Sequence, residues 1–260
     1  MGMAHSSFLF LYQQTENKMT GHNYFERAEL LFGAEAMQKL QETRVAIFGI
    51  GGVGSWCAES LVRTGIGHLT LVDYDCVCES NVNRQAMATA ATVGLPKTTA
   101  LKAHLQEINP NVDITEMPMR YSEETESSFD LNSYDYIVDA IDNIADKALL
   151  IRRACETRAV LLSSMGAALK SDPTKIAVAE FWKVKGCPLA AALRRRFKKA
   201  NLFPAKKFKC VYSEEQPIGR TATGDASRLR VNGSIVHVTA IFGFTLAGLL
   251  VNDVRRESLI

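Results

Sequence analysis

The chain has 260 residues, of which 47% are hydrophobic and 22% are charged. This composition is typical of a globular protein with a core of its own, and it excludes a disordered chain, a collagen and a small disulfide scaffold. The 30 Lys and Arg against 28 Asp and Glu give a formal net charge of +2, which by itself indicates no particular partner.

The first 23 residues are expected to form an N-terminal extension. They contain a short apolar run, residues 8–12, but no basic region before it and no small-residue cleavage site after it. A secretory signal peptide has both features. We therefore do not expect a signal peptide here.

From Thr43 onward, short apolar strands alternate with amphipathic helices. The predicted strands are Arg44–Phe48, His68–Asp73, Tyr136–Asp142 and Ala159–Ser163. The predicted helices are Val53–Thr64, Val93–Asn109 and Ala148–Thr157. Such alternation predicts an α/β fold with a parallel, doubly wound, Rossmann-like sheet. We expect one domain over residues 24–260, with an N-terminal helical lead-in, a nucleotide-binding core at 43–165, a basic insertion at 183–212 and an apolar tail.

A glycine-rich loop directly follows the first predicted strand and precedes a predicted helix. Its glycines are Gly49, Gly51, Gly52 and Gly54. Glycines let the backbone approach a polyphosphate, whose charge is met by backbone N–H groups and by the positive end of the helix. Asp73, at the end of the second predicted strand, can accept hydrogen bonds from a ribose diol. The pattern predicts nucleotide binding and leaves the nucleotide open.

The charged residues that follow favour ATP over a nicotinamide dinucleotide. Arg84 and Lys97 place two cations within reach of the glycine loop. A triphosphate that loses pyrophosphate needs several cations, whereas a dinucleotide carries only a pyrophosphate. Asp139 and Asp142, at the end of the third predicted strand, are expected at the mouth of the sheet, where a carboxylate can hold Mg²⁺. Each residue alone could be an ordinary surface charge, but the set favours ATP.

The segments GIGGVG, VDYD, NVNRQ, VGLPK and DAIDN, in this order, resemble the adenylating enzymes related to ubiquitin activation, the ThiF–MoeB–HesA superfamily. The resemblance covers about residues 24–165. It implies that Asp73 binds ribose and that Asp142 binds Mg²⁺ and is indispensable for adenylation. It also implies a homodimer in which Arg27 reaches the phosphates of the neighbouring subunit. The implied ATP site consists of Gly49, Gly51, Gly52, Gly54, Asp73, Asp75, Asn81, Arg84, Gln85, Lys97 and Asp142.

Two features indicate the branch of this superfamily. Sulfur-carrier adenylyltransferases usually have two CxxC pairs that bind structural zinc, and none of the six cysteines here forms a CxxC pair, so we expect no structural zinc. The basic segment 183–209, residues 209–215 and the apolar tail resemble instead the branch that dehydrates threonylcarbamoyladenosine in tRNA to its cyclic form. In that branch ATP would activate the threonyl carboxylate as an acyl-adenylate, with release of pyrophosphate, and the substrate's own carbamoyl group would close the ring and release AMP.

Residues 183–209 hold ten bases and no acid, so the remaining chain has 20 bases against 28 acids. Bases that neutralise phosphates give salt-sensitive, largely sequence-independent affinity, and this segment is a candidate site for tRNA. A solvated helix face is the alternative, and the interleaved aromatic residues could stack on bases or pack the segment. The candidate RNA-binding residues are Arg194, Arg195, Arg196, Lys198, Lys199, Lys206, Lys207 and Lys209.

Cys210 is a candidate nucleophile, because the nearby lysines would lower the pKa of an exposed thiol. A packed thiol is the preferred interpretation, since cyclisation needs no catalytic cysteine. The alternative function is an adenylyltransferase that activates the C-terminus of a ubiquitin-like sulfur carrier, with Cys210 taking the acyl group. A sulfur-transfer or acceptor protein would then be a further partner. A nicotinamide-dependent oxidoreductase and a non-enzymatic RNA-binding module are the remaining alternatives.

Residues 235–251 form an apolar run of seventeen residues. A membrane-spanning helix needs about 20, so we expect a buried helix or a subunit interface, and no stable membrane insertion. Cysteines outside any disulfide pattern favour a cytoplasmic protein.

Overall fold

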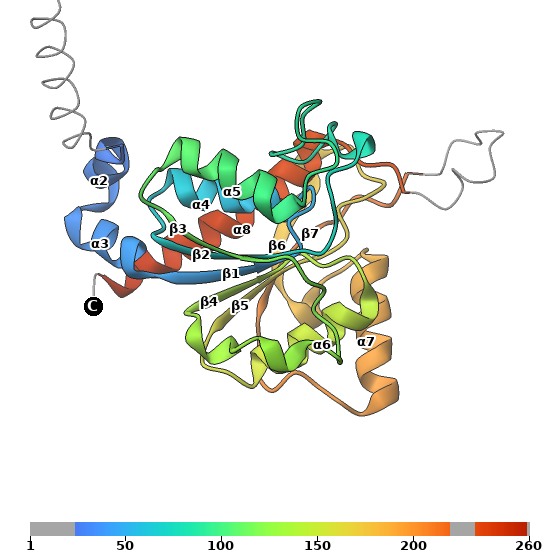
Figure 1. Ribbon diagram of the computed structural model, residues 1–260. Coiled ribbons are helices and arrows are strands. Elements are labelled where there is room, and N and C mark those ends of the chain that lie inside the picture. Colours follow the sequence, from blue (N-terminus) through green and yellow to red (C-terminus); the bar gives the residue numbers. More distant parts are fainter. Residues whose placement is uncertain (1–23, 219–231, 259–260) are drawn as a thin grey trace, which may run out of the picture.

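The computed structural model describes residues 24–218 and 232–258; the expected N-terminal extension lies outside them. Within this part of the chain, a seven-stranded sheet lies between two layers of helices (Figure 1). The strand order is β3-β2-β1-β4-β5-β7-β6, with only β6 antiparallel to its neighbour. The strands are β1 Arg44–Phe48, β2 His68–Val72, β3 Asp113–Met117, β4 Tyr136–Asp139, β5 Val160–Ser164, β6 Ile176–Glu180 and β7 Lys209–Ser213. The predicted α/β doubly wound sheet is confirmed.

Helices cover both faces of the sheet. In Figure 1, α4, α5 and α8 lie on one face, α6 and α7 lie on the other, and α2 and α3 lie near the end where β1 begins. The α-helices are α2 Glu26–Phe32, α3 Ala34–Glu42, α4 Gly54–Arg63, α5 Lys97–Ile108, α6 Ile144–Cys155, α7 Pro188–Ala200 and α8 Val236–Glu257. Short 3₁₀ turns are η1 Glu79–Asn81, η2 Glu126–Ser128, η3 Leu131–Ser133, η4 Pro173–Lys175 and η5 Phe181–Lys183.

The central strand β1 explains why the sequence builds two cores. Successive side chains of a strand point to opposite faces, so Val45 and Ile47 pack under α4 and α8. Ala46 and Phe48 pack in the second cluster, with the residues of α6 and α7. All four side chains are buried. An uninterrupted apolar strand is therefore required at this position.

Several predicted boundaries were wrong by a few residues, for local reasons. The helix predicted from Val93 begins at Lys97, because Gly94 has φ +91° and Pro96 is the N-cap. The strand predicted to run to Asp142 ends at Asp139, and the residues beyond it form a loop. The helix predicted from Ala148 already begins at Ile144, because the Asn143 side chain accepts hydrogen bonds from its first turn.

The basic segment is an integral part of the sheet rather than an appended insertion. Its helix α7 packs on α6, and β7 lies between β5 and β6. The buried apolar side chains of this segment contribute to the second core cluster: Val184, Cys187, Ala190, Leu193, Phe197, Phe208, Cys210 and Tyr212. The residues of the predicted basic insertion at 183–212 therefore contribute to the sheet and to its second core cluster.

The apolar tail forms α8, which packs closely on α4. A Cβ at Gly243 would lie 2.5 Å from Val53 O and 2.7 Å from Cys57 N, so only glycine permits this approach. By length and composition alone α8 could cross a membrane, but half of its apolar window is buried inside the protein. A core helix satisfies the same criteria, and the buried side of α8 packs in the first core cluster, in agreement with the expectation of a buried helix or a subunit interface.

Candidate active site

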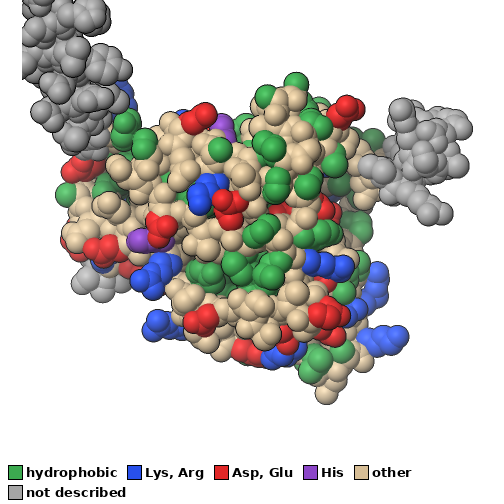
Figure 2. Space-filling view, in the orientation of Figure 1, with side chains coloured by type: hydrophobic (Ala, Val, Ile, Leu, Met, Phe, Trp, Pro, Cys, Tyr) green, Lys and Arg blue, Asp and Glu red, His purple; other side chains and the backbone are tan. Residues whose placement is uncertain are grey.

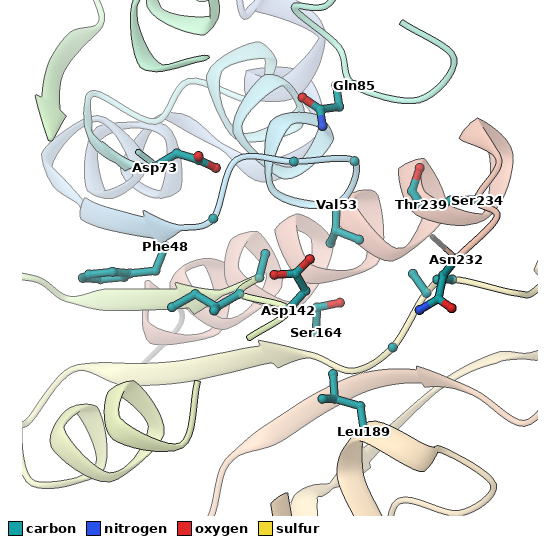
Figure 3. Close-up of a pocket in the computed structure, with 18 of the residues that line it drawn as sticks. Phe48, Val53, Asp73, Gln85, Asp142, Ser164, Leu189, Asn232, Ser234 and Thr239 are labelled. Atoms are coloured by element: carbon teal, nitrogen blue, oxygen red, sulfur yellow. The ribbon is translucent and has the colours of Figure 1, made fainter. Parts of the chain in front are cut away.

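A pocket of about 740 Å³ opens at the carboxyl ends of β1, β2, β4 and β5. Figure 3 shows Asp73 towards one end of this pocket, Asp142 near its middle, and Ser234, Asn232 and Leu189 towards the other end. Open α/β sheets bind their ligands at this edge. Among the residues predicted for the ATP site, the pocket is lined by Gly49, Gly51, Gly52, Asp73, Asp75, Asn81, Arg84, Gln85, Lys97 and Asp142.

The glycine loop is held tightly between β1 and α4. Gly49 has φ +84°, and a Cβ there would lie 2.8 Å from Ala140 O. A Cβ at Gly54 would lie 1.9 Å from Gly49 O, so both positions require glycine. The loop thus places its backbone and the N-terminus of α4 at the pocket, as phosphate binding requires.

Asp73 is fixed at the end of β2 by two backbone N–H groups. Ile50 N donates to Asp73 Oδ2 at 2.9 Å, and Asp75 N donates to Oδ1 at 3.0 Å. Lys97 Nζ lies 2.7 Å from Asp75 Oδ2 and 3.7 Å from Asp73 Oδ1. The two carboxylates hold the buried Lys97 ammonium beside the glycine loop, and a polyphosphate would compete for this cation.

Arg84 and Gln85 follow η1 and line the same pocket. Arg84 Nη1 donates to Ser80 O at 2.7 Å and to Asn83 Oδ1 at 3.0 Å. Both acceptors are uncharged, so these hydrogen bonds leave the positive charge of Arg84 unneutralised. The side chain of Gln85 is only 5% exposed, and its Oε1 has no hydrogen-bond partner within the described chain. A buried polar atom normally has a partner, and a bound ligand would provide one.

Asp142 is the pocket carboxylate that best suits a metal ion. Asp146 is already bound by Arg120, whose Nε and Nη2 lie 2.7 and 3.1 Å from its oxygens. Asp142 is exposed and has no hydrogen bond or ion pair in the described ranges. Mg²⁺ needs only one or two protein carboxylates when phosphates supply the other ligands. The donor chemistry of Asp142 therefore fits Mg²⁺ held together with a nucleotide.

Asp139 does not lie at the mouth of the sheet, contrary to expectation. Its side chain is fully buried, with Lys147 Nζ 2.7 Å and Ser163 Oγ 2.6 Å from Oδ2. Burial raises the pKa of the Asp139 carboxyl above its usual value, although the nearby Lys147 ammonium acts in the opposite direction. Asp139 is a core residue that supports the pocket from below, and it is unsuited to metal binding.

Sequence reasoning missed one wall of the pocket and most of another, of which it placed only Ser164, Met165 and Gly166 at the pocket. Arg120 follows β3, a strand that was not predicted, and its guanidinium lies 6.0 Å from the centroid of the Tyr74 ring. The opposite wall includes Ser164 at the end of β5, residues 165–170 after it, and Thr239 of α8. The rule that strand ends share one edge of a sheet would have found the residues after β5 and β3, but nothing in the sequence indicated that α8 reaches the pocket.

Arg27 and Cys210 do not line this pocket. Arg27 lies exposed on α2, near the end of the molecule where β1 begins (Figure 1). The side chain of Cys210 in β7 is fully buried, and this burial raises the pKa of its thiol. Since a thiolate is the reactive form, the weak candidacy of Cys210 as a nucleophile is corrected: the side chain is a packed thiol. The predicted role of Arg27 in a neighbouring subunit remains a prediction.

Two of the candidate RNA-binding bases have structural partners. Arg194 Nη1 donates to Phe181 O at 3.1 Å and to Val184 O at 3.0 Å. Lys206 Nζ donates to Thr157 O at 2.8 Å and also to Ala159 O. We therefore correct these two predictions, because both side chains donate hydrogen bonds to backbone carbonyls and so stabilise the fold. The remaining bases of the segment are exposed: Lys183, Lys185, Arg195, Arg196, Lys198, Lys199, Lys207 and Lys209. Figure 2 shows Lys and Arg side chains on the side of the molecule where α7 lies.

The fold and the pocket define a Rossmann-like nucleotide-binding protein. The model of the ThiF family matches residues 25–254, and the chain belongs to this family. It is 35% identical to a tRNA threonylcarbamoyladenosine dehydratase of Bacillus subtilis, over 90% of this chain and 95% of that protein. A crystal structure of the E. coli tRNA N6-threonylcarbamoyladenosine dehydratase in complex with ATP superposes with a TM-score of 0.81 at 33% identity, covering 90% of this chain and 95% of that one. An adenylyltransferase and sulfurtransferase of Drosophila virilis is 38% identical, over 54% of this chain and 30% of that protein.

Proposed function

We propose that this protein uses ATP to convert threonylcarbamoyladenosine in tRNA into its cyclic form, with release of AMP and pyrophosphate. The observation that carries the proposal is the extent of the similarity. The Bacillus subtilis and E. coli dehydratases match 90% of this chain and 95% of their own chains. The adenylyltransferase and sulfurtransferase matches only about half of the chain. The alternative, activation of a sulfur-carrier protein, is therefore less well supported.

The pocket provides the groups that adenylation requires. One oxygen of the threonyl carboxylate attacks the α-phosphorus of ATP, the bond to the β-phosphate oxygen breaks, and pyrophosphate leaves. The carbamoyl group then attacks the acyl carbon and loses a proton, the ring closes, and AMP leaves with the carboxylate oxygen. Arg84, Lys97 and the N–H groups of the glycine loop lie where they would stabilise the charge that moves onto pyrophosphate. Asp73 would hold the ribose.

Three further parts of the proposal concern metal, assembly and location. Asp142 would hold Mg²⁺, which neutralises the phosphates when bound. A homodimer would bring Arg27 of one subunit to the phosphates of the other, since Arg27 does not line the pocket of its own chain. The cysteines of the described residues are free thiols, which supports a reducing compartment such as the cytoplasm. A sulfur-transfer or acceptor protein stays a further candidate partner.

The test is mass spectrometry of nucleosides from tRNA that contains threonylcarbamoyladenosine, incubated with the protein and Mg-ATP. We expect the loss of one water from this nucleoside, together with formation of AMP. Asp142→Ala should abolish the product while Asp130→Ala, a change of an exposed acid outside the pocket, should not. An unchanged nucleoside beside an adenylated carrier protein would overturn the proposal.

A further inference from the structure

Lys170 is a nearly buried cation in the wall of the pocket, and the predicted ATP site does not include it. Its side chain belongs to the segment that follows β5, and the residue is only 4% exposed. Its ammonium donates to the backbone carbonyl of Glu215. Among the residues that the structure describes, no carboxylate lies within the 4 Å of an ion pair with Lys170. Burial lowers the pKa of Lys170.

A buried charge is normally paired, because desolvation makes an unpaired one costly. The other lysine that is both buried and in the pocket wall, Lys97, has two carboxylates beside it. Glu215 accepts a hydrogen bond from Lys170 through its backbone carbonyl. Its carboxylate accepts hydrogen bonds from Ser171 N and Asp172 N and acts on Lys170 only from beyond ion-pair distance, where it raises the pKa of the lysine. The position of Lys170 therefore suits an anion that is supplied from outside the chain.

The backbone that carries Lys170 is held in an unusual conformation. Leu169 has φ +60°, in the left-handed region that non-glycine residues rarely adopt. Its N–H donates to Gly233 O at 2.9 Å, and its carbonyl accepts from Ile218 N at 2.7 Å. Such backbone strain persists where the surrounding structure fixes it, and it clusters at binding sites. Here it fixes the segment beside Lys170 against the two stretches of chain that flank the pocket.

The order of the strands indicates which anion this is. Asp73 follows β2, the glycine loop follows β1, Asp142 follows β4, and the Lys170 segment follows β5, which is the next strand along the sheet. Ribose and phosphates are expected over the first three of these positions. In Figure 3, Ser164, Leu189 and Asn232 lie beyond Asp142 as seen from Asp73. The group that attacks the α-phosphorus must approach it opposite the departing pyrophosphate, and the β5 side of the pocket offers space for such a group next to the nucleotide.

From these observations we propose that Lys170 binds the carboxylate of the substrate and so orients it towards the α-phosphorus of ATP. This inference rests on the proposed function, because that function defines the acyl substrate. One carboxylate oxygen would accept a hydrogen bond from the ammonium while the other faces the nucleotide. Lys170 thus acts as a specificity residue for a substrate with a free carboxylate.

The test compares two synthetic anticodon stem-loops, one with threonylcarbamoyladenosine and one with its uncharged threoninamide counterpart. Binding is measured with α,β-methylene ATP present, so that no adenylation occurs. A hydrogen bond to a charged group predicts that the wild-type protein prefers the carboxylate by about tenfold or more. Lys170→Met should lose this preference and keep its affinity for the ATP analogue. Lys170→Arg should keep part of the preference.

Lys175→Met is the matched control, because Lys175 is exposed in the same part of the chain and does not line the pocket. It should retain the full preference. If Lys170→Met fails to fold, Lys170→Gln is measured in its place. The proposal is overturned if the variant still prefers the carboxylate, if the wild type shows no preference, or if ATP binding falls by the same factor. Failure of the proposed function is a separate result, seen as absence of cyclisation by the wild-type protein.

Discussion

Lys147 Nζ lies 2.7 Å from Asp139 Oδ2, and both side chains are fully buried beneath the pocket. Lys147 Nζ also donates to Ile141 O at 3.1 Å, the carbonyl next to Asp142 in the chain. One lysine on α6 therefore neutralises the acid at the end of β4 and holds the loop that carries the candidate metal ligand. The pair links the stability of the fold to the geometry of the site.

Lys147→Met should strongly destabilise the protein, because it leaves the buried carboxyl group of Asp139 without its cation. The expected loss is about 3–5 kcal/mol in the free energy of unfolding, measured by urea denaturation. Lys102→Met, a change of a lysine on α5 that is one-third exposed, should cost less than about 1 kcal/mol. The double variant Lys147→Met/Asp139→Leu should recover part of the loss. Equal stabilities of Lys147→Met and the wild type would contradict this account of the pair.

The different fates of Asp139 and Asp142 show how far the sequence could lead. Both acids follow the same apolar strand, so the strand-end rule predicted both at the pocket. That rule is correct for Asp142, but the side chain that decides the burial of Asp139 is Lys147, one turn into the following helix. Nothing local to the strand indicates that this lysine turns inward. The pairing of buried charges depends on tertiary packing, which periodicity does not contain.

The strands away from the centre of the sheet were harder to predict than the central ones. The central strands are mostly apolar runs, whereas β3 has the sequence DITEM, in which only Ile114 is buried. Strand β7 begins in a basic segment, where charge suggested a surface. The basic segment carries both a polar face and a buried one. Its Arg194 and Lys206 stabilise the fold by donating hydrogen bonds to backbone carbonyls. Composition alone cannot separate these uses of a cation.

Cys210→Ala should retain cyclisation to within about twofold, because a buried protonated thiol is a poor nucleophile. Its rate is measured by the nucleoside assay beside the wild type. Brief iodoacetamide treatment of the folded protein should label the exposed Cys76 and Cys78 and spare Cys210, as read by peptide mass spectrometry. Loss of activity in a folded Cys210→Ala protein, or a thioester that this change removes, would favour the sulfur-carrier alternative.

The double variant Arg195→Ala/Lys199→Ala should weaken tRNA binding and reduce its dependence on salt. Both side chains are exposed on α7. For each phosphate that the protein no longer neutralises, the slope of log K against log salt should fall in magnitude by about 0.7–0.9. The measurement is the affinity for tRNA at several salt concentrations. Lys175→Ala/Arg256→Ala removes two exposed bases elsewhere and should leave the slope unchanged. The same slope for both double variants would indicate that α7 does not bind RNA.

The contribution of Glu59 to stability should disappear in acid. His104 Nε2 lies 2.9 Å from Glu59 Oε2 and Arg63 Nε lies 2.8 Å from Oε1, and the hydrogen bond with His104 is the largest cause that lowers the pKa of Glu59 below 4.5. A lowered pKa in the folded state stabilises the fold above pH 4.5, and this gain is lost as the pH falls through the folded value. The stability difference between wild type and Glu59→Gln should thus be below about 1 kcal/mol at pH 7 and smaller at about pH 3. Urea denaturation at both pH values measures this stability difference.

Glu107→Gln, a change of an exposed acid on α5, is the control and should show no such pH dependence. A pH-independent stability difference for Glu59→Gln would refute the assignment.

Arg27→Ala and Asp142→Ala should each inactivate the protein alone and complement each other when mixed. If Arg27 serves the pocket of the neighbouring subunit, a mixed dimer contains one pocket with an intact Asp142 and an intact Arg27 facing it. Random exchange makes half of the dimers mixed, with one of two sites restored, so about a quarter of wild-type activity should return. The measurement is cyclisation after subunits are mixed and allowed to exchange. Each variant assayed alone gives the baseline without complementation, and Arg256→Ala mixed with Asp142→Ala should keep about half of wild-type activity, because its own dimers and one site of each mixed dimer work. If the Arg27→Ala mixture stays inactive although exchange is verified by mass spectrometry of the dimers, Arg27 does not act across the interface.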